Sequence, residues 1–250
     1  MRTLGRRFRR AENTCAAAGT TAGTTAGTTT PNGRSRIPDN GSAAGMAFVD
    51  GLRSDGAMAV DLAGEEQAAP KVLRFGAGPV QPWRNGGGQT RELAAEPAGA
   101  GFAWRLSIAD IDASGPFSAF PGVDRVIIPC GGQEMSLTVD GVEHDLVPFE
   151  PFRFPGQAAT SCRIAGPTRD LNVMVRHGAF AAEVRVVSAA GEVVARAGDV
   201  TIAVLLSGSA TVAVASLVVQ PLDALWLIPG TVCRIEGDGR LAVVRITPEE

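Results

Sequence analysis

An internal repeat constrains the fold of this chain more than any other feature of its sequence. In each half an aliphatic segment ends at a glycine and is followed by a hairpin-like segment, a Pro-Gly pair and a Cys-Arg-Ile segment. Matching positions are 77 residues apart at Gly131 and Gly208, and 71 residues apart at Cys162 and Cys233. Two similar units in one chain predict a pair of small β-barrels or jelly rolls that pack together.

The local pattern is that of short strands joined by turns. Residues 102–111 alternate between two faces, and Asp140-Gly141 between two strand-like arms is a strong hairpin signal. The 31 glycines and 16 prolines suit tight turns, and no amphipathic helix of useful length is visible. We therefore predict an all-β fold. The order strand, glycine, hairpin, Pro-Gly and strand resembles one half of a cupin, so the whole chain resembles a bicupin of two packed jelly rolls.

Three segments are expected along the chain. Residues 1–69 are predicted to be a disordered, low-complexity tail, residues 70–187 a first cupin-like barrel, and residues 188–250 a second, shorter cupin-like unit. The run of threonine, alanine and glycine over residues 20–30 lacks large apolar side chains. Such a segment cannot bury enough surface to offset the entropy of ordering, which is why a disordered tail is expected.

The arginine-rich run at residues 6–10 is open to two interpretations. As a targeting signal it would need an apolar segment directly after it, and residues 11–18 are too short and too polar for that. A transit peptide fits the composition only weakly. The favoured interpretation is a solvated tail, with Met46 and Met58 as alternative start positions if the tail arises from an upstream start codon.

Composition argues against two classes of partner. The formal net charge of −3 argues against nucleic acid and acidic membrane surfaces, since both call for a basic patch. No stretch reaches the roughly 18 consecutive apolar residues of a membrane helix. The four cysteines lack the spacing of metal sites, so buried reduced thiols are expected. A disulfide among Cys130, Cys162 and Cys233 stays open.

Four clusters of polar residues and glycines interrupt the strand-like sequence. They lie at residues 83–90, 102–110, 115–125 and 170–176. Polar groups set among apolar strands indicate a ligand cavity rather than a purely structural core.

The first cluster contains three consecutive glycines. Glycines let the backbone approach a ligand and present N–H groups, as in an anion-binding nest, and they suit a tight turn equally well. The loop is neither a P-loop nor a dinucleotide fingerprint, because no Gly-Lys-Ser/Thr follows and no βαβ unit surrounds it. Its candidate ligand-binding residues are Asn85, Gly87, Gly88 and Thr90.

Arginines stand beside small polar residues in the later clusters. Arg105 and Ser107 share one strand face, and Asn172 and Arg176 share a face of another strand. An inward-pointing arginine with such a neighbour suits a carboxylate, because the guanidinium offers a bidentate fork. The alternative is that these faces meet solvent, or that each arginine pairs with a structural acid. Arg125 is a further candidate for ligand binding.

Metal binding and catalysis find little support in the sequence. Cupins commonly bind a metal through a His-x-His pair, a carboxylate and a further histidine. This chain has two histidines, His144 and His177, without ligand spacing, so no metal and no other cofactor is expected. No nucleophile-and-base motif is visible. Glu92 and His177 are the candidates for a general acid or base if the protein is an enzyme, which is less expected than a non-catalytic role.

Taken in order, the four clusters resemble the HutD family, called Ves in some bacteria. The matching segments are WRNGGGQT at 83–90, WRLSIA at 104–109, GPFSAFPGVDR at 115–125 and DLNVMVR at 170–176. The resemblance covers roughly residues 71–187 and, more loosely, the rest of the chain. It implies a bacterial, cytoplasmic bicupin associated with histidine catabolism, and it implies small-molecule binding or regulation more readily than catalysis.

Three functions are open at this stage. The first is a metal-independent bicupin that binds a small anionic metabolite, such as a histidine-breakdown intermediate or related acyl-amino acid, and regulates catabolism by sensing or sequestering it. The second is a metal-independent isomerase, hydrolase or lyase acting on a similar acid. The third is a protein-interaction module in which the clusters only stabilise loops. No nucleic-acid or membrane partner is expected, and exposed strand edges leave a homodimer open.

Overall fold

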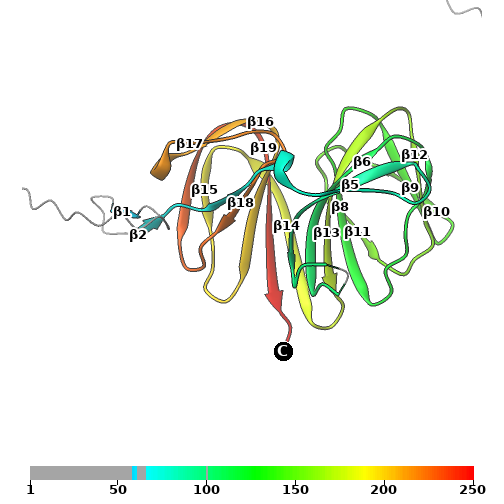
Figure 1. Cartoon of the computed structure of the whole chain (residues 1–250), viewed down its shortest axis with the longest axis horizontal. Helices are drawn as coiled ribbons and strands as arrows, with labels where there is room; N and C mark the ends of the chain where they lie inside the picture. The colour runs from blue at the N-terminus through cyan, green and yellow to red at the C-terminus, as the bar shows by residue number, and fades with distance from the viewer. Residues whose placement is uncertain (1–57, 61–65, 100) are drawn as a thin grey trace, which may run out of the picture. The chain divides into compact units, whose positions relative to one another are not determined.

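The computed structural model describes residues 58–60, 66–99 and 101–250, and in this part of the chain the fold is all-β, as predicted (Figure 1). Two short 3-10 helices, η1 (Phe75–Ala77) and η2 (Ala213–Ala215), are the exceptions. No helix among these residues is long and apolar enough to cross a membrane. Most of the tail predicted at residues 1–69 lies outside the described residues.

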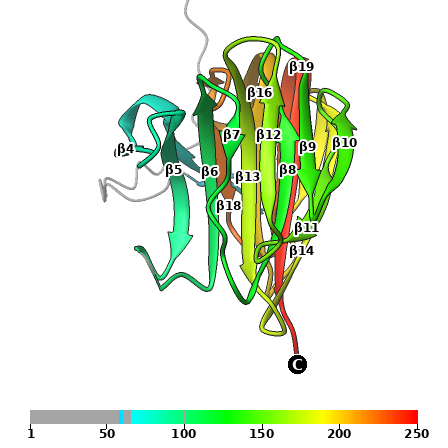
Figure 2. The ribbon, with the colours of Figure 1, turned by 90° about the vertical axis from the view of Figure 1, so that its right-hand side faces the viewer.

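The strands of residues 80–176 form two sheets that enclose one apolar interior, and we call this part the N-terminal barrel. In Figure 2 its central strands β6, β13 and β8 can be followed side by side. The six-stranded sheet has, in spatial order, the strands β11 (Phe152–Pro155), β8 (Val123–Pro129), β13 (Thr168–Arg176), β6 (Trp104–Ile111), β5 (Gly88–Glu96) and β4 (Val80–Pro82). The four-stranded sheet has the strands β10 (Val142–Leu146), β9 (Met135–Val139), β12 (Thr160–Ile164) and β7 (Gly115–Pro116).

A single seven-stranded sheet forms the second part, which we call the C-terminal barrel. Its main path consists of β14 (Phe180–Ser188), β19 (Val232–Pro248), β16 (Val200–Val212), β18 (Ala224–Leu227) and β3 (Lys71–Leu73). Two short strands complete it, β15 (Gly191–Val194) on β19 and β17 (Leu217–Val219) on β16. Strands β3 and β14 thus pair with strands of the C-terminal half. A separate pair, β1 (Met58–Val60) and β2 (Glu66–Ala68), is antiparallel. The division of the chain at residues 187 and 188 stays a prediction.

One apolar core joins the two barrels. Leu106 and Val173, from β6 and β13, pack in it with Val204 and Val244, from β16 and β19. The opposite faces of these strands belong to separate interiors, one in each barrel. Successive residues of a strand point to opposite faces, so the alternation predicted for residues 102–111 sends one set of side chains into the shared core and the other into the N-terminal barrel.

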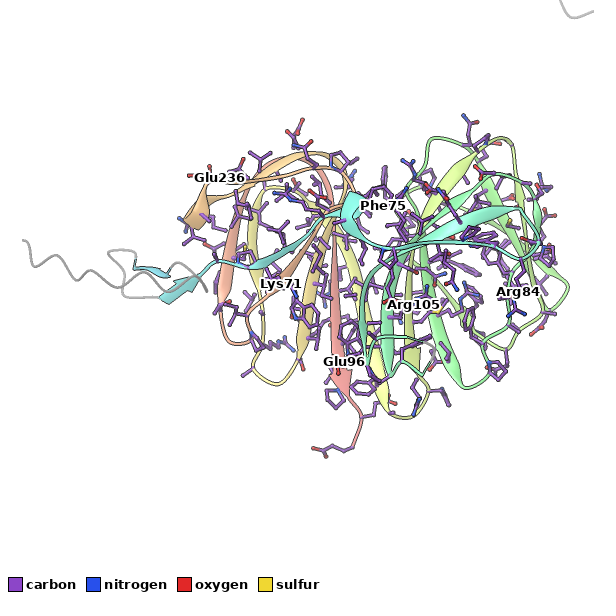
Figure 3. All side chains as sticks on the ribbon, in the orientation of Figure 1. Lys71, Phe75, Arg84, Glu96, Arg105 and Glu236 are labelled. Carbon is purple, nitrogen blue, oxygen red and sulfur yellow. The ribbon has the colours of Figure 1, made fainter. Side chains whose placement is uncertain are left out.

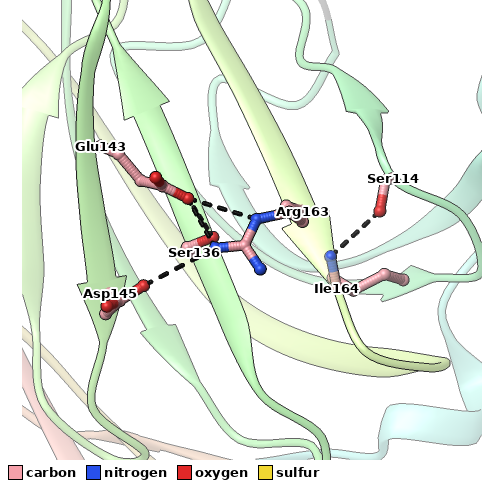
Figure 4. Close-up of polar contacts among 6 residues, drawn as sticks. All are labelled: Ser114, Ser136, Glu143, Asp145, Arg163 and Ile164. Atoms are coloured by element: carbon pink, nitrogen blue, oxygen red, sulfur yellow. Dashed lines mark hydrogen bonds and ion pairs between the residues drawn. The ribbon is translucent and has the colours of Figure 1, made fainter. Parts of the chain in front are cut away.

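The four-stranded sheet also carries polar contacts near its surface. Nη2 of Arg163 lies 2.6 Å from Oε1 of Glu143 and 4.0 Å from Asp145, and these side chains are largely exposed (Figure 4). The backbone N–H of Ile164 donates to the hydroxyl of Ser114 at 3.0 Å. Exposed ion pairs of this kind contribute little to stability, because water and salt screen them.

Asp223 connects the segment that runs between the barrels to the C-terminal barrel. Its buried carboxylate accepts hydrogen bonds from Nη1 of Arg74 at 2.7 Å, from the backbone N–H of Phe75 at 2.9 Å and from that of Gln220 at 3.1 Å. The ring of Phe75 lies against Arg91, with the guanidinium carbon 5.1 Å from the ring centre. Residues 74–75 therefore contact both barrels.

We expect Asp223→Ala to lower the free energy of unfolding by about 2 kcal/mol, since it leaves two partly buried backbone donors and Arg74 without their partner. Urea unfolding of the full chain measures this. The control is Glu192→Ala, which removes a half-exposed ion pair with Arg234 (2.9 Å) and is expected to cost less than about 1 kcal/mol. Equal losses in the two variants would contradict a structural role for the Asp223 contacts.

Candidate functional site

A cavity of about 660 Å³ lies over the inner face of the six-stranded sheet. The residues that line it from β5, β6, β8 and β13 are Thr90, Glu92, Arg105, Ser107, Ala109, Arg125, Asp170, Asn172 and Met174. The residues that line it from loops and from β4 and β7 are Gln81, Pro82, Trp83, Arg84, Asn85, Gly99, Phe102, Pro116, Phe117, Ser118 and Phe120. Figure 3 shows Arg84 and Arg105 in the N-terminal barrel, away from Glu236 in the other barrel.

Strand register arranges the cavity residues in levels. Met174 on the central strand β13 lies opposite Arg105 on β6 and Arg125 on β8. Two residues before Met174 on β13, Asn172 lies opposite Ser107. Asp170 lies two residues before Asn172 on the same strand. With a rise of about 3.3 Å per residue, successive levels are separated by about 7 Å. The cavity therefore has a level with two arginines at one end and a carboxyl group at the other.

Arg125 is a buried cation surrounded by aromatic rings. Its guanidinium carbon lies 4.8 Å from the ring centre of Phe154, 5.4 Å from that of Phe120 and 5.6 Å from that of Phe117. Nη1 donates to the carbonyl of Ser118 at 3.4 Å, and Nε has no partner. Burial lowers the pKa of Arg125 to about 10, against an opposing effect of Asp170. The side chain thus stays charged at neutral pH and keeps an unused donor.

Arg105 carries the second charge at this level. Its Nε lies 3.1 Å from Oε2 of Glu92, and its guanidinium carbon is 5.9 Å from the ring centre of Phe102. The contact with Glu92 is an ion pair without hydrogen-bond geometry, because Nε has no hydrogen-bond partner. Glu92 thus compensates part of the charge of Arg105, and the donors of the guanidinium are not all used.

Two buried groups on β13 have acceptor atoms without partners. Asp170 is completely buried, and neither of its carboxyl oxygens accepts a hydrogen bond; Oδ1 of Asn172 is likewise unpaired. Burial raises the pKa of Asp170 to about 7, although Arg125 opposes this shift. Buried polar atoms are rarely left without partners in native proteins, and each such atom costs roughly 1–3 kcal/mol. These atoms are therefore candidates for contact with a bound molecule.

The glycine loop at residues 83–90 is held by its own hydrogen bonds. The indole N–H of Trp83 donates to the hydroxyl of Thr90 at 2.8 Å, and the backbone N–H of Gly87 donates to Oδ1 of Asn85 at 3.1 Å. Gly86 has a φ of +71°, which favours glycine. A Cβ on Gly88 would lie 2.3 Å from the carbonyl oxygen of Asp110, so this position needs glycine for strand pairing.

The structure brings together most of the residues proposed from the sequence. Those that line the cavity are Asn85, Thr90, Arg105, Ser107, Arg125 and Asn172. Those outside its lining are Gly87, Gly88 and Arg176. Arg176 is exposed and points a donor at the carbonyl of Gly101, 3.4 Å away. No contact with the cavity supports a ligand-binding role for these three residues, and that role stays a prediction.

Sequence reasoning did not propose Asp170 as a ligand-binding residue. The available signal was its phase, because it lies two residues from Asn172 and so shares its strand face. For Glu92 the sequence predicts only a general acid or base, and the side chain lies in the cavity beside Arg105.

Neither histidine lines the cavity. His177 is exposed, and its Nδ1 lies 2.8 Å from Oδ2 of Asp124, which raises the pKa of the imidazole. His144 packs against Phe152, with 4.9 Å between ring centres. Within the described ranges, no group of three or more His, Cys, Asp or Glu side chains could hold a metal ion.

The buried carboxyl of Asp170 predicts a pH-dependent stability. Because its pKa is about 7 in the folded protein and 3.8 for the free group, the folded state retains a proton between these values that the unfolded state releases. The free energy of unfolding should therefore fall as the pH rises from about 4 to about 7. Asp170→Asn cannot titrate, so we expect it to lack this decline and to be more stable at pH 8 by up to a few kcal/mol.

Urea unfolding at pH 4, 6 and 8 measures the difference between the two proteins. The control is Asp145→Asn, which removes a carboxyl whose side chain is 92% exposed. Parallel pH profiles for Asp170→Asn and the unmodified chain would contradict the raised pKa.

Comparison with known proteins agrees with this architecture. The family model of HutD matches residues 78–243. A protein from the hutC 3' region of Pseudomonas putida is 44% identical over 108 residues, which cover 42% of this chain and 57% of that protein. Protein Ves of Citrobacter koseri is 43% identical over 112 residues, covering 43% of this chain and 59% of Ves. The match thus spans less than two thirds of these relatives.

Solved structures extend the comparison to the whole fold. HutD from Pseudomonas fluorescens has a TM-score of 0.63 and 34% identity, covering 73% of this chain and all of that chain. A variant of oxalate decarboxylase from Bacillus subtilis, 8% identical, has a TM-score of 0.51 over 72% of this chain and 77% of its own, and this likeness concerns the fold alone. The bicupin prediction is confirmed. This chain belongs to the HutD family.

Proposed function

We propose that this protein binds a small anionic metabolite in the cavity of its N-terminal barrel, without a metal. The observation that carries the proposal is the pair of arginines, Arg105 and Arg125, that flank Met174 at one level of the cavity. The buried Nε of Arg125 has no hydrogen-bond partner, and that of Arg105 contacts Glu92 at 3.1 Å without hydrogen-bond geometry. A carboxylate can take two parallel hydrogen bonds from a guanidinium, and such charge-assisted bonds are stronger than neutral ones.

The charge of the lining favours an anion. Three arginines, Arg84, Arg105 and Arg125, line the cavity together with two acids, Glu92 and Asp170. The positive charges outnumber the negative ones, and the excess grows because Asp170, with a pKa of about 7, is partly protonated at neutral pH. Aromatic walls and burial reduce screening by water, which strengthens the attraction between a bound anion and these arginines.

The resemblance to the HutD family supports a role in histidine catabolism. One relative comes from the hutC 3' region, and HutD is the name of a structural relative. We therefore propose a cytoplasmic role in which binding of a metabolite, such as a histidine-breakdown intermediate or related acyl-amino acid, regulates amino-acid catabolism. Sequestration or sensing would serve this role without turnover.

Glu92 favours a second candidate function, that of a metal-independent enzyme. Its carboxylate lies in the cavity beside Arg105 and could accept a proton from a bound substrate. His177, the other candidate, does not line the cavity. The third possibility, an interaction module, finds less support because a cavity of about 660 Å³ leaves room for a ligand.

We expect Arg105→Ala to weaken the binding of short carboxylates such as glutarate at least tenfold, because it removes a charge-assisted contact. Isothermal titration calorimetry with the full chain measures the affinity. Arg163→Ala is the matched control, since Arg163 is exposed on the four-stranded sheet and pairs with Glu143 (Figure 4). Unchanged affinity in Arg105→Ala, with normal thermal unfolding, would defeat the site assignment.

Turnover separates the first candidate function from the second. Carboxylates that bind are incubated with the protein and followed by NMR. A regulator returns them unchanged, which is the expected result. Conversion that is lost in Glu92→Gln, with binding retained, would favour an enzyme with Glu92 as its acid or base.

A further inference from the structure

The cavity holds two guanidinium groups and its unpaired acceptors at different levels. At the level of Met174, the arginines on β6 and β8 offer only donors. At the levels of Asn172 and Asp170, Oδ1 of the amide and both oxygens of the carboxyl have no hydrogen-bond partner. A molecule bound along β13 would therefore meet two guanidinium groups at one end, of which that of Arg105 also contacts Glu92, and unpaired acceptors at the other.

The protein itself does not satisfy these acceptors. Arg125 is the cation whose charge acts on Asp170, but its side chain donates a hydrogen bond to the carbonyl of Ser118, and its Nε is unpaired. Ser107 lies opposite Asn172 across the strands, and Oδ1 of Asn172 is still without a partner. Both Asn172 and Asp170 are buried and line the cavity. At pH 8, where Asp170 is mostly ionised, a purely anionic ligand would leave these acceptors unpaired, because it brings acceptors of its own.

We propose that the ligand of this cavity has two different ends: a carboxylate that binds Arg105 and Arg125, and a hydrogen-bond donor, such as an amide N–H, that binds Asn172 and Asp170. This inference rests on the proposed function and specifies the chemical class of its ligand. The donor end satisfies buried acceptors that otherwise have no hydrogen-bond partner. It also provides selectivity, because a site built to accept a hydrogen bond rejects an analogue that lacks the donor.

The spacing of the levels sets the length of such a ligand. Met174 and Asn172 are two residues apart on one strand, which corresponds to about 7 Å. Long arginine side chains shorten the distance to be spanned. Glutaramate, in which three methylene groups separate a carboxylate from a primary amide, is a probe of suitable size. Monomethyl glutarate has the same carboxylate and chain, but its ester end has no donor.

The test compares these two probes by isothermal titration calorimetry with the full chain at pH 8. We expect glutaramate to bind at least tenfold more tightly than monomethyl glutarate. Glutarate, with a carboxylate at both ends, should also bind more weakly than glutaramate, because its second carboxylate faces Asp170. In Asn172→Leu, the preference for glutaramate over the ester should fall to about threefold or less.

Thr201→Val is the control for the loss of a buried polar group. Thr201 is fully buried, its hydroxyl has no partner, and it lies on β16 of the C-terminal barrel. This variant should keep the full preference for glutaramate. The comparison of probes on the unmodified chain does not depend on the folding of any variant.

The outcomes distinguish this inference from the function on which it rests. Equal binding of the amide and the ester, or a preference that persists unchanged in Asn172→Leu, would overturn the donor-binding end and leave the carboxylate site standing. If the preference disappears in Asn172→Leu and persists in Thr201→Val, the inference is supported. If none of the three probes binds at millimolar concentration, the proposed anion site is overturned, and the inference with it.

Discussion

The central strands of the six-stranded sheet have one apolar face, which packs in the shared core, and one polar face, which lines the cavity. The rest of the structure depends on this division. On β6, Leu106 points into the core shared by the barrels, whereas Arg105 and Ser107 line the cavity. On β13, Val173 and Asn172 are divided in the same way. Because side chains alternate along a strand, a slip of one residue would place charged groups in the shared core. One register therefore specifies both the packing of the barrels and the composition of the site.

The two barrels differ in what their interiors hold. An apolar cluster that includes Leu205, Leu225 and Leu227 fills the C-terminal barrel, while the N-terminal barrel combines a smaller apolar cluster with the cavity. Unpaired acceptors such as those of Asp170 are unfavourable for folding. Burial of apolar side chains in the shared core and in the C-terminal barrel offsets that cost. The C-terminal barrel thus supports a site to which it contributes no lining residue.

The site was partly predictable because some of its information is local. The alternation over residues 102–111 placed Arg105 and Ser107 on one face, and both line the cavity. The sequence does not predict Asp170 as a ligand-binding residue, because an acid near arginines is expected to form an ion pair. Its complete burial without a hydrogen bond is not visible in the sequence. For a similar reason, the sequence left open whether Gly88 contacts a ligand or serves a tight turn. The need for glycine there comes from the carbonyl of Asp110, which strand pairing brings close.

The sequence by itself determined the all-β class, the repeat and the family resemblance, because periodicity, turn residues and motif order depend on neighbours along the chain. Only the tertiary structure decided which polar groups meet. Strands β5, β6, β8 and β13 bring their cavity residues together through pairing between distant segments. The same holds for β3, which joins the C-terminal barrel although it precedes the N-terminal barrel in the chain. Burial, missing hydrogen-bond partners and the raised pKa of Asp170 are properties of that assembly, since each depends on what surrounds a residue in space.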